Sequence, residues 1–224
     1  MLHSIHSVKP RLFTLASIGL LALLGAVSIP ARIGFSASQG STTTSDGAGS
    51  HRKGAELVGK PAPPFHLTHW LNSPSLEPAD LKGKVLLVRW WTDSCPFCEA
   101  TAPALRALDR KYRERGLVVA GIFHPKPSGD ESLRRMRKAA DRLGFDFPLA
   151  LDAHWDALDR WWLKEHPRDW TSVSFIVDKR GVIRYVHPGG EYHEGPGIDD
   201  GADHAACRQA YLEIEKTIVR LLAE

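Results

Sequence analysis

The stretch VLLVRWWTDSCPFC, residues 85–98, decides the fold of this chain of 224 residues. Its first half, Val85–Trp91, is an almost continuous apolar run of strand length, which is typical of a central strand covered on both faces. A helix is expected to follow over residues 96–115 and to end at a glycine. Cys95 and Cys98 therefore stand at the junction between a buried strand and a helix.

Outward from this stretch, the chain after residue 54 alternates between expected strands and helices. We expect strands at Phe65–Trp70, Leu117–Phe123, Phe147–Leu151, Val173–Val177 and Val182–Val186, and helices at Glu131–Leu143, Trp155–Lys164 and Asp203–Leu222. The last two strands flank DKRG, residues 178–181, which is typical of a hairpin turn. This order predicts an α/β sandwich in which a mixed central sheet is flanked by helices.

Composition narrows the class of protein. The sequence has 43% hydrophobic and 25% charged residues, which excludes a chain that is disordered throughout. The formal net charge of +3 comes from the N-terminal region, so residues 55–224 are close to neutral and lack the basic surface that nucleic-acid binding needs. Three cysteines are too few for a small domain that disulfides hold together.

The N-terminal segment is expected to direct export. Lys9 and Arg11 precede Leu12–Ile29, a run without charges that is barely long enough to cross a bilayer as a helix. We therefore expect a signal peptide or membrane anchor over residues 1–35, a flexible Ser/Thr/Gly linker over 36–54 and one domain over 55–224. The domain would lie in the bacterial periplasm or at the outer face of the inner membrane, either tethered or secreted.

The C-x-x-C pair can close a small disulfide ring. Cys95 lies where the unpaired N–H groups and the dipole of the following helix stabilise a thiolate, so it is expected to be the nucleophile. Cys98, one turn into the helix, is expected to be partly buried and to resolve a mixed disulfide. A metal site is the alternative, because His204 and Cys207 form an H-x-x-C pair that could complete a zinc centre with the two cysteines.

Further motifs surround the C-x-x-C pair. They are Val58-Gly-Lys-Pro-Ala-Pro63 and Leu81-Lys-Gly-Lys84 ahead of two expected strands, Trp91 four residues before Cys95, Pro103 inside the expected helix, and Phe175-Ile-Val-Asp178 followed by Gly181. In these motifs, over residues 57–190, the chain resembles the thioredoxin superfamily. Within it, the chain is similar to the exported thiol–disulfide oxidoreductases of the TlpA/ResA type.

The resemblance implies a thioredoxin-like three-layer fold and an enzyme that acts on exported proteins through a redox-active disulfide. Cys95 and Cys98 would carry this chemistry without a metal or another cofactor. Trp91, Thr92 and the intervening Pro96-Phe97 would support them. The partners would be thiols or disulfides of exported proteins, and an electron partner in the membrane or the periplasm. The direction of electron flow stays open.

Two residues depart from the pattern that the family implies. Ser172 stands where the family normally has a cis-proline; a cis bond before serine costs about 3–4 kcal/mol, so we expect a trans bond. Either the Ser172 hydroxyl faces the sulfurs, or Ser172 is an ordinary turn residue. Arg89 stands where thioredoxins place a buried acid. A buried cation there would favour thiolates and make the pair more oxidising, whereas an exposed Arg89 would pair with an acid.

An insertion follows the expected strand Leu117–Phe123. If that strand runs parallel to the central one, His124 emerges at the same sheet edge as Cys95 and could act as an acid or base toward a thiol; the alternative is a polar surface residue. The basic run at residues 134–138 is expected to be a solvated helix face.

Cys207 shares one stripe of the last expected helix with Tyr211, Ile214, Ile218 and Leu221, which favours a buried core cysteine. A third redox role for it stays open. His187, Glu191 and His193 could form a polar cluster, which nothing in the sequence orients.

Three other functions compete with disulfide exchange. A peroxidase of the peroxiredoxin type would use Cys95 with Thr92. The proline that precedes them in that family is Val88 here, and the position of its arginine falls near Ser172, which is not an arginine. A copper carrier with the thioredoxin fold would add a histidine such as His124 or His187 to the two thiolates. An inactive scaffold would keep the disulfide for stability alone.

Overall fold

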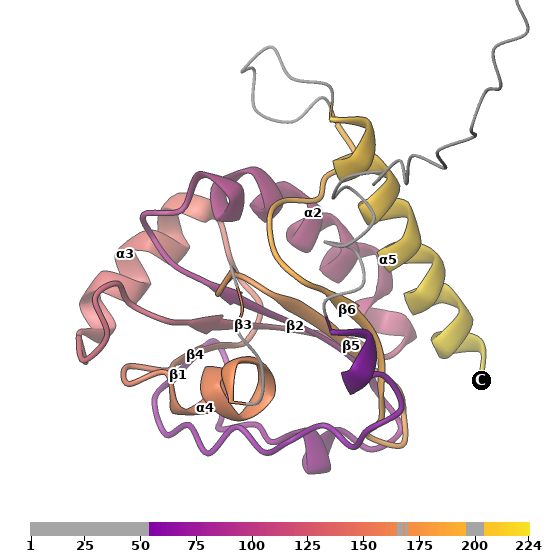
Figure 1. Cartoon of the computed structure of the whole chain (residues 1–224), viewed down its shortest axis with the longest axis horizontal. Helices are drawn as coiled ribbons and strands as arrows, with labels where there is room; N and C mark the ends of the chain where they lie inside the picture. Colours follow the sequence, from indigo (N-terminus) through magenta and orange to yellow (C-terminus); the bar gives the residue numbers. More distant parts are fainter. Residues whose placement is uncertain (1–53, 165–167, 169, 196–203) are drawn as a thin grey trace, which may run out of the picture. The chain divides into compact units, whose positions relative to one another are not determined.

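The computed structural model describes residues 54–164, 168, 170–195 and 204–224 (Figure 1). The expected export segment, residues 1–35, and nearly all of the expected linker lie outside these ranges, so both remain predictions. Within the described ranges, no helix is both long enough and apolar enough to span a membrane.

A six-stranded mixed sheet forms the middle layer, in the order β1-β4-β3-β2-β5-β6 (Figure 1). Its strands are β1 Trp70–Leu71, β2 Val85–Trp91, β3 Leu117–Phe123, β4 Leu149–Leu151, β5 Ser174–Val177 and β6 Ile183–His187. Strands β2, β3 and β4 run parallel, whereas β1, β5 and β6 pair antiparallel with their neighbours. The predicted α/β fold with a mixed sheet is confirmed.

Helices cover both faces of the sheet (Figure 1). The helices α2 Pro96–Tyr112, α3 Leu133–Leu143 and α5 Ala205–Ala223 pack on one face, and α4 Asp156–Leu158 with the π-helix η4 Asp159–Leu163 packs on the other. Short 3-10 helices lie at η1 Ala55–Leu57, η2 Pro78–Leu81 and η3 Arg113–Arg115. The sheet thus separates two hydrophobic cores, which gives the expected three layers.

Strand β2 is buried along its whole length, and its side chains alternate between the two cores. Leu86, Val88 and Trp90 belong to the core under α4, whereas Val85, Leu87 and Trp91 belong to the core under α2 and α5. Because Arg89 has the parity of the second set, its side chain lies on the α2 face, which also carries the cysteines.

Helix α2 begins immediately after Cys95, with Pro96 in its first turn, where proline is tolerated because that N–H has no helical partner. Its last turn tightens into η3, and Gly116, at a φ of 102°, ends it in the left-handed conformation. Strands β2 and β3 end level, with Trp91 opposite Phe123, so the chain leaves both strands at one edge of the sheet.

Two elements differ from the expectation. The strand expected at Phe65–Trp70 is reduced to β1, because the Glu77 carboxylate accepts hydrogen bonds from the backbone N–H groups of Phe65 and His66, at 2.6 and 2.7 Å. The helix expected at Trp155–Lys164 divides into a short α4 and the π-helix η4. The other expected elements are confirmed, with ends that move by a few residues.

Candidate active site

Cys95 and Cys98 lie at the N-terminal end of α2, and both are free thiols. Cys95 occupies the N-cap position and is partly exposed, whereas Cys98 is 2% exposed. The backbone N–H of Cys98 donates to the carbonyl of Cys95 at 3.0 Å, which closes the first turn around the pair. One sulfur is therefore accessible to another molecule, and the second lies behind it.

The surroundings of the two sulfurs separate their acidities. A hydrogen bond from the Cys98 thiol, helped by the Cys98 backbone N–H, the Ser172 hydroxyl and the charge of Arg89, lowers the pKa of Cys95 to about 5. The same hydrogen bond and deep burial raise the pKa of Cys98 far above that of an ordinary thiol. At neutral pH the outer sulfur is a thiolate and the inner sulfur keeps its proton.

Ser172 faces both sulfurs. Its Oγ lies 3.1 Å from Cys98 Sγ and 3.9 Å from Cys95 Sγ. The peptide bond before it is trans, since Lys126–Pro127 is the one cis bond among the described residues. The loop that bears Ser172 thus presents a hydroxyl to the cysteines at the position where the family resemblance implies a proline.

Arg89 is fully buried on the same face as Cys98. Its guanidinium donates to the Ser174 hydroxyl at 3.3 Å and to the Gly190 carbonyl at 2.7 Å, and its Cζ atom lies 5.4 Å from the centre of the Tyr192 ring. Within the described part of the chain it forms no ion pair with a carboxylate, so the alternative of an exposed, acid-paired Arg89 is wrong. Its positive charge helps to lower the pKa of Cys95 and partly opposes the rise in the pKa of Cys98.

Trp91 and Thr92, which precede the cysteines, are both buried. Trp91 is buried, with ring centres 4.8 Å from Phe123 and 5.1 Å from Phe145. Thr92 is also buried, and its hydroxyl donates to the adjacent Asp93 carboxylate at 3.3 Å. Pro96 begins α2, as described above. These residues therefore shape the loop that leads into the C-x-x-C pair.

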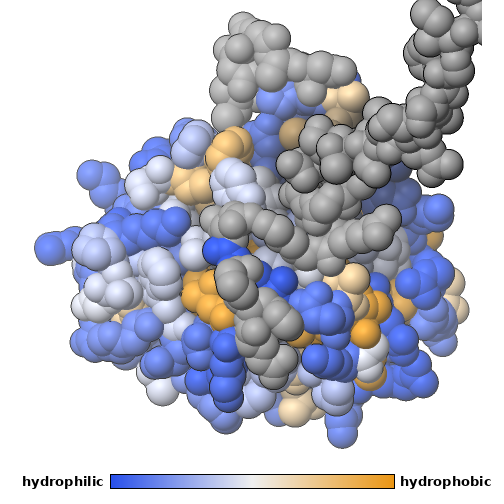
Figure 2. Space-filling view, in the orientation of Figure 1, coloured by the Kyte–Doolittle hydropathy of each residue, from blue (hydrophilic) through white to orange (hydrophobic). Residues whose placement is uncertain are grey.

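Phe97, between the two cysteines, meets the ring of Trp170 edge-on, with 5.3 Å between ring centres. Trp170 is 40% exposed and is one of only four large hydrophobic residues exposed in the described part of the chain. Where described residues are visible in Figure 2, the surface is mostly hydrophilic and apolar side chains form small separate groups. Trp170 thus places an exposed aromatic ring against the residue between the two cysteines.

An ion pair that the sequence analysis missed fixes the loop before Cys95. Arg135 of α3 binds both carboxylate oxygens of Asp93 at 2.7 Å and also pairs with Asp130 at 3.0 Å. Arg142 donates to the Asp93 carbonyl at 3.0 Å. The expectation that residues 134–138 are only a solvated face is thus wrong for Arg135, because its guanidinium is held by two carboxylates.

His124 emerges at the same sheet edge as Cys95, and its backbone N–H donates to the Trp91 carbonyl at 2.9 Å. Its side chain is buried: Nε2 lies 2.8 Å from the Thr171 hydroxyl, and the ring meets Trp155 at 5.5 Å. Burial lowers the pKa of His124 to about 3, so the imidazole is neutral at physiological pH. The interpretation as a polar surface residue is wrong, and an acid–base role toward a thiol stays a prediction.

Cys207 lies apart from the C-x-x-C pair. It is only partly buried, so the prediction of a buried core cysteine is wrong, although the remaining members of its stripe are in the core. Burial, followed by the nearby Glu191 carboxylate, raises the pKa of Cys207 to about 11. Among the described residues, His204 and Cys207 do not join the C-x-x-C pair in one ligand group, so the alternative of a mixed zinc centre finds no support.

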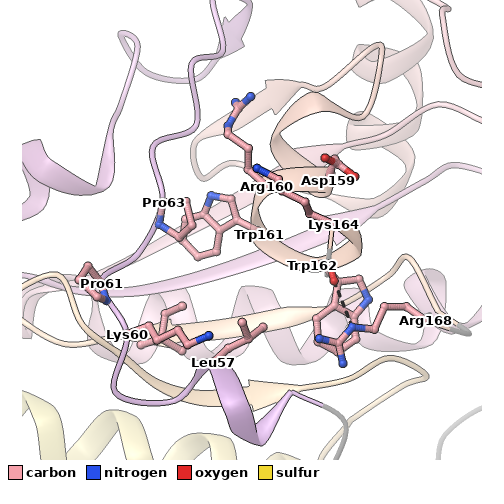
Figure 3. Close-up of a pocket in the computed structure, with 11 residues that line it drawn as sticks. Leu57, Lys60, Pro61, Pro63, Asp159, Arg160, Trp161, Trp162, Lys164 and Arg168 are labelled. Atoms are coloured by element: carbon pink, nitrogen blue, oxygen red, sulfur yellow. Dashed lines mark hydrogen bonds between the residues drawn. The ribbon is translucent and has the colours of Figure 1, made fainter. Parts of the chain in front are cut away.

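A separate pocket lies on the other face of the sheet (Figure 3). Residues of η1, η4 and the segment 60–63 line it, with the Trp161 ring close to Pro63 in the close-up. Arg168 lies at one end, where its Nε donates to the Trp162 carbonyl at 3.0 Å. Because the lining residues pack on the core under α4, this pocket is not part of the dithiol site.

The acidity of the two thiols predicts their reactivity. We expect iodoacetamide to modify Cys95 alone, with a rate that rises with pH to a plateau and has its midpoint near pH 5, because the thiolate is the attacking species. Mass spectrometry of peptides after short exposures would measure this profile. Equal modification of Cys98, or a midpoint near that of a free thiol, would contradict the assignment.

Comparison with known proteins places the chain in a family. The family model described as AhpC/TSA family matches residues 58–186. Thioredoxin-like protein YneN of Bacillus subtilis is 30% identical over 131 residues, which cover 58% of this chain and 71% of YneN. Protein DipZ of Mycobacterium tuberculosis is 31% identical over 131 residues, which cover 57% of this chain but only 18% of DipZ.

Solved structures share the fold. A thiol:disulfide interchange protein from Chlorobium tepidum superposes with a TM-score of 0.53 at 18% identity, over 73% of this chain and 96% of its own. The thioredoxin domain of a thiol-disulfide oxidoreductase from Bacteroides vulgatus gives 0.52 at 20% identity, over 72% and 97%. The matched family model, which spans more than half of the sequence, and this thioredoxin-like fold show that the chain belongs to the AhpC/TSA family.

Proposed function

We propose that the chain is a thiol–disulfide oxidoreductase whose reacting groups are Cys95 and Cys98. The observation that carries the proposal is the pair of adjacent sulfurs with opposite acidities, an accessible thiolate in front of a buried thiol. A low-pKa thiolate is a good nucleophile and also a good leaving group, so the pair suits exchange in both directions. The names of several relatives, such as the thiol-disulfide oxidoreductase ResA of Bacillus anthracis, agree with it.

The geometry orders the steps. The Cys95 thiolate attacks one sulfur of a client disulfide, which forms a mixed disulfide and releases the first client thiolate. Cys98 then loses its proton and attacks Cys95 Sγ, which releases the second client thiolate and leaves a Cys95–Cys98 disulfide. The client gains two electrons and the chain loses two; the reverse sequence oxidises the client. The disulfide is the only redox group that this mechanism needs.

The clients that we propose are exported proteins. The support is the charged start and the apolar run Leu12–Ile29, which favour export or anchoring. The exposed Trp170 ring, packed against the partly buried Phe97 between the two cysteines, offers a surface for an extended client segment. An electron partner in the membrane or the periplasm would restore the resting redox state.

The test is a redox titration of the full chain in glutathione buffers, with thiols counted by mass after alkylation. We expect Cys95 and Cys98 to oxidise together in one two-electron transition while Cys207 stays a thiol. The potential is expected to lie above the roughly −270 mV of thioredoxin, because a stabilised thiolate favours the reduced form. If Cys95 and Cys98 never pair, the proposal fails.

A peroxidase is the second candidate, and the family match favours it. The site has fewer groups that could stabilise a reacting peroxide. The Thr92 hydroxyl bonds to Asp93, and Ser172 stands where a peroxidase of this type would have a positive charge. Peroxide consumption by the reduced chain decides between them: a rate well above that of disulfide exchange would favour the peroxidase. A copper carrier finds no support, since no group of three or more ligating side chains in the described ranges contains Cys95 or Cys98.

The charge of Arg89 is expected to set the potential. Arg89→Met, which fills similar space without a charge, should raise the pKa of Cys95 and move the potential to more negative values, by roughly 30 mV for each unit of pKa. The glutathione titration measures this shift. Arg106→Met is the control, because Arg106 donates to the Leu143 carbonyl instead. An unchanged potential in Arg89→Met would show that its charge does not reach the sulfurs.

A further inference from the structure

Four side chains with metal-binding atoms meet where the segment after β6 passes the start of α5. They are Glu191, His193, His204 and Cys207, and their ligand atoms all lie within 4.8 Å of one another. The first three are less than 9% exposed, and Cys207 is partly buried. The proposed function uses none of them, and the two segments that carry them are brought together only by the fold.

Two atoms of this cluster are buried without a hydrogen-bond partner among the described residues: His193 Nε2 and Glu191 Oε2. The other ring nitrogen of His193, Nδ1, lies 2.8 Å from the Gly195 carbonyl, which can only accept a hydrogen bond. In the neutral imidazole Nδ1 therefore carries the proton and Nε2 presents a lone pair, 3.6 Å from Glu191 Oε1. A buried acceptor left unpaired is unfavourable, and a cation held between the His193 imidazole and the Glu191 carboxylate would remove this penalty.

Three distances between the ligand atoms can be compared with those of a tetrahedral zinc site. Glu191 Oε1 lies 2.8 Å from His204 Nδ1, 3.6 Å from His193 Nε2 and 3.5 Å from Cys207 Sγ. With zinc bonds to oxygen, nitrogen and sulfur, neighbouring ligand atoms of a tetrahedron stand about 3.3–3.6 Å apart. The hydrogen bond of His193 to a backbone carbonyl is also the outer contact that orients zinc-binding histidines.

The donor set selects the kind of metal. One sulfur, two imidazole nitrogens and one carboxylate oxygen suit Zn²⁺, whereas magnesium and calcium require oxygen ligands. His204 and Cys207 are three residues apart at the start of α5, so both can face the same side of the helix. From this geometry we propose that Glu191, His193, His204 and Cys207 form a zinc site, separate from the dithiol.

Zinc bound there would tie the segment after β6 to α5. That segment also holds Arg89, because Gly190 accepts the guanidinium hydrogen bond and Tyr192 lies against it. The Tyr192 backbone N–H is also 3.4 Å from the Thr101 hydroxyl of α2. The site is thus structural, and it supports the segment that keeps the cation beside the sulfurs.

Cobalt is the probe for the test, because Co²⁺ bound to a thiolate in a tetrahedral site absorbs in the near ultraviolet and the visible. We expect the reduced full chain to bind one Co²⁺ with a thiolate charge-transfer band, and Zn²⁺ to displace it and raise the unfolding temperature. The double variant Cys95→Ser/Cys98→Ser should bind in the same way. Failure of the wild-type chain to bind would overturn the proposal.

Two single variants locate the site. Cys207→Ser should lose the charge-transfer band, and His193→Gln should weaken binding beyond the about 10–100-fold that loss of an outer hydrogen bond causes. Circular dichroism of both variants without metal checks that α5 forms. If the band persists in Cys207→Ser and disappears in the double variant, the C-x-x-C pair holds the metal and the proposal is wrong. Disulfide exchange is measured separately, so each result leaves the proposed function to its own test.

Discussion

Replacing Cys95 with serine is expected to reduce disulfide exchange by at least about a thousandfold, because a serine hydroxyl is not ionised at neutral pH and cannot attack a disulfide. The assay follows reduction of a protein disulfide by the full chain in the presence of excess reductant. The large effect is expected because no second thiolate lies at the surface of the site: Cys98 is buried and keeps its proton.

Cys98→Ser is the matched variant, since it makes the same chemical change three residues further along. In this variant the Cys95 thiolate should still attack a client disulfide, but the mixed disulfide should accumulate because the resolving thiol is missing. Non-reducing gel electrophoresis and mass spectrometry would detect the adduct at Cys95. Accumulation of an adduct in Cys95→Ser instead would reverse the roles of the two cysteines.

Trp90→Ala is expected to lower the free energy of unfolding by roughly 3–5 kcal/mol. The ring of Trp90 is fully buried, with centres 5.3 Å from Trp161 and 5.8 Å from Phe175, and its Nε1 donates to Asp152 at 3.4 Å. Truncation therefore leaves a large cavity in the core under α4. Denaturant unfolding of the full chain measures the loss.

Trp170→Ala is the control for this prediction, because it also removes one tryptophan but from a position that is 40% exposed. Its effect on unfolding should be much smaller, since far less apolar surface returns to water. If the two variants lose similar stability, the core under α4 is not tightly packed around Trp90.

Local patterns explain why the sequence predicted the strands of the sheet so well. Both β2 and β3 are apolar runs that end at polar residues, so their bounds follow from the pattern itself. The strand expected at Phe65–Trp70 failed for a reason that no local pattern contains. Glu77 comes 11 and 12 residues after the two residues whose N–H groups it binds, and only the fold brings it there.

In the candidate site, too, the sequence identified some residues and missed others. The spacing of Cys95 and Cys98 made them visible in the sequence, because both lie on one helical turn. The partners of Asp93 and Arg89 were not visible: Arg135 is 42 residues from Asp93, and Gly190 is 101 residues from Arg89. A basic run is usually a solvated surface, so nothing local distinguishes Arg135 from its neighbours. Such contacts require the topology before they can be inferred.

The Ser172 hydroxyl gives the reaction a movable dipole. In the exchange proposed above, the negative charge leaves Cys95 when the mixed disulfide forms and develops on Cys98 as it attacks. A hydroxyl hydrogen can turn about its C–O bond without motion of the backbone, and Oγ lies within 3.9 Å of both sulfurs. One side chain can therefore follow the charge from the first sulfur to the second. Proline at this position has no such hydrogen, so the serine would add a stabilising donor to both halves of the proposed cycle.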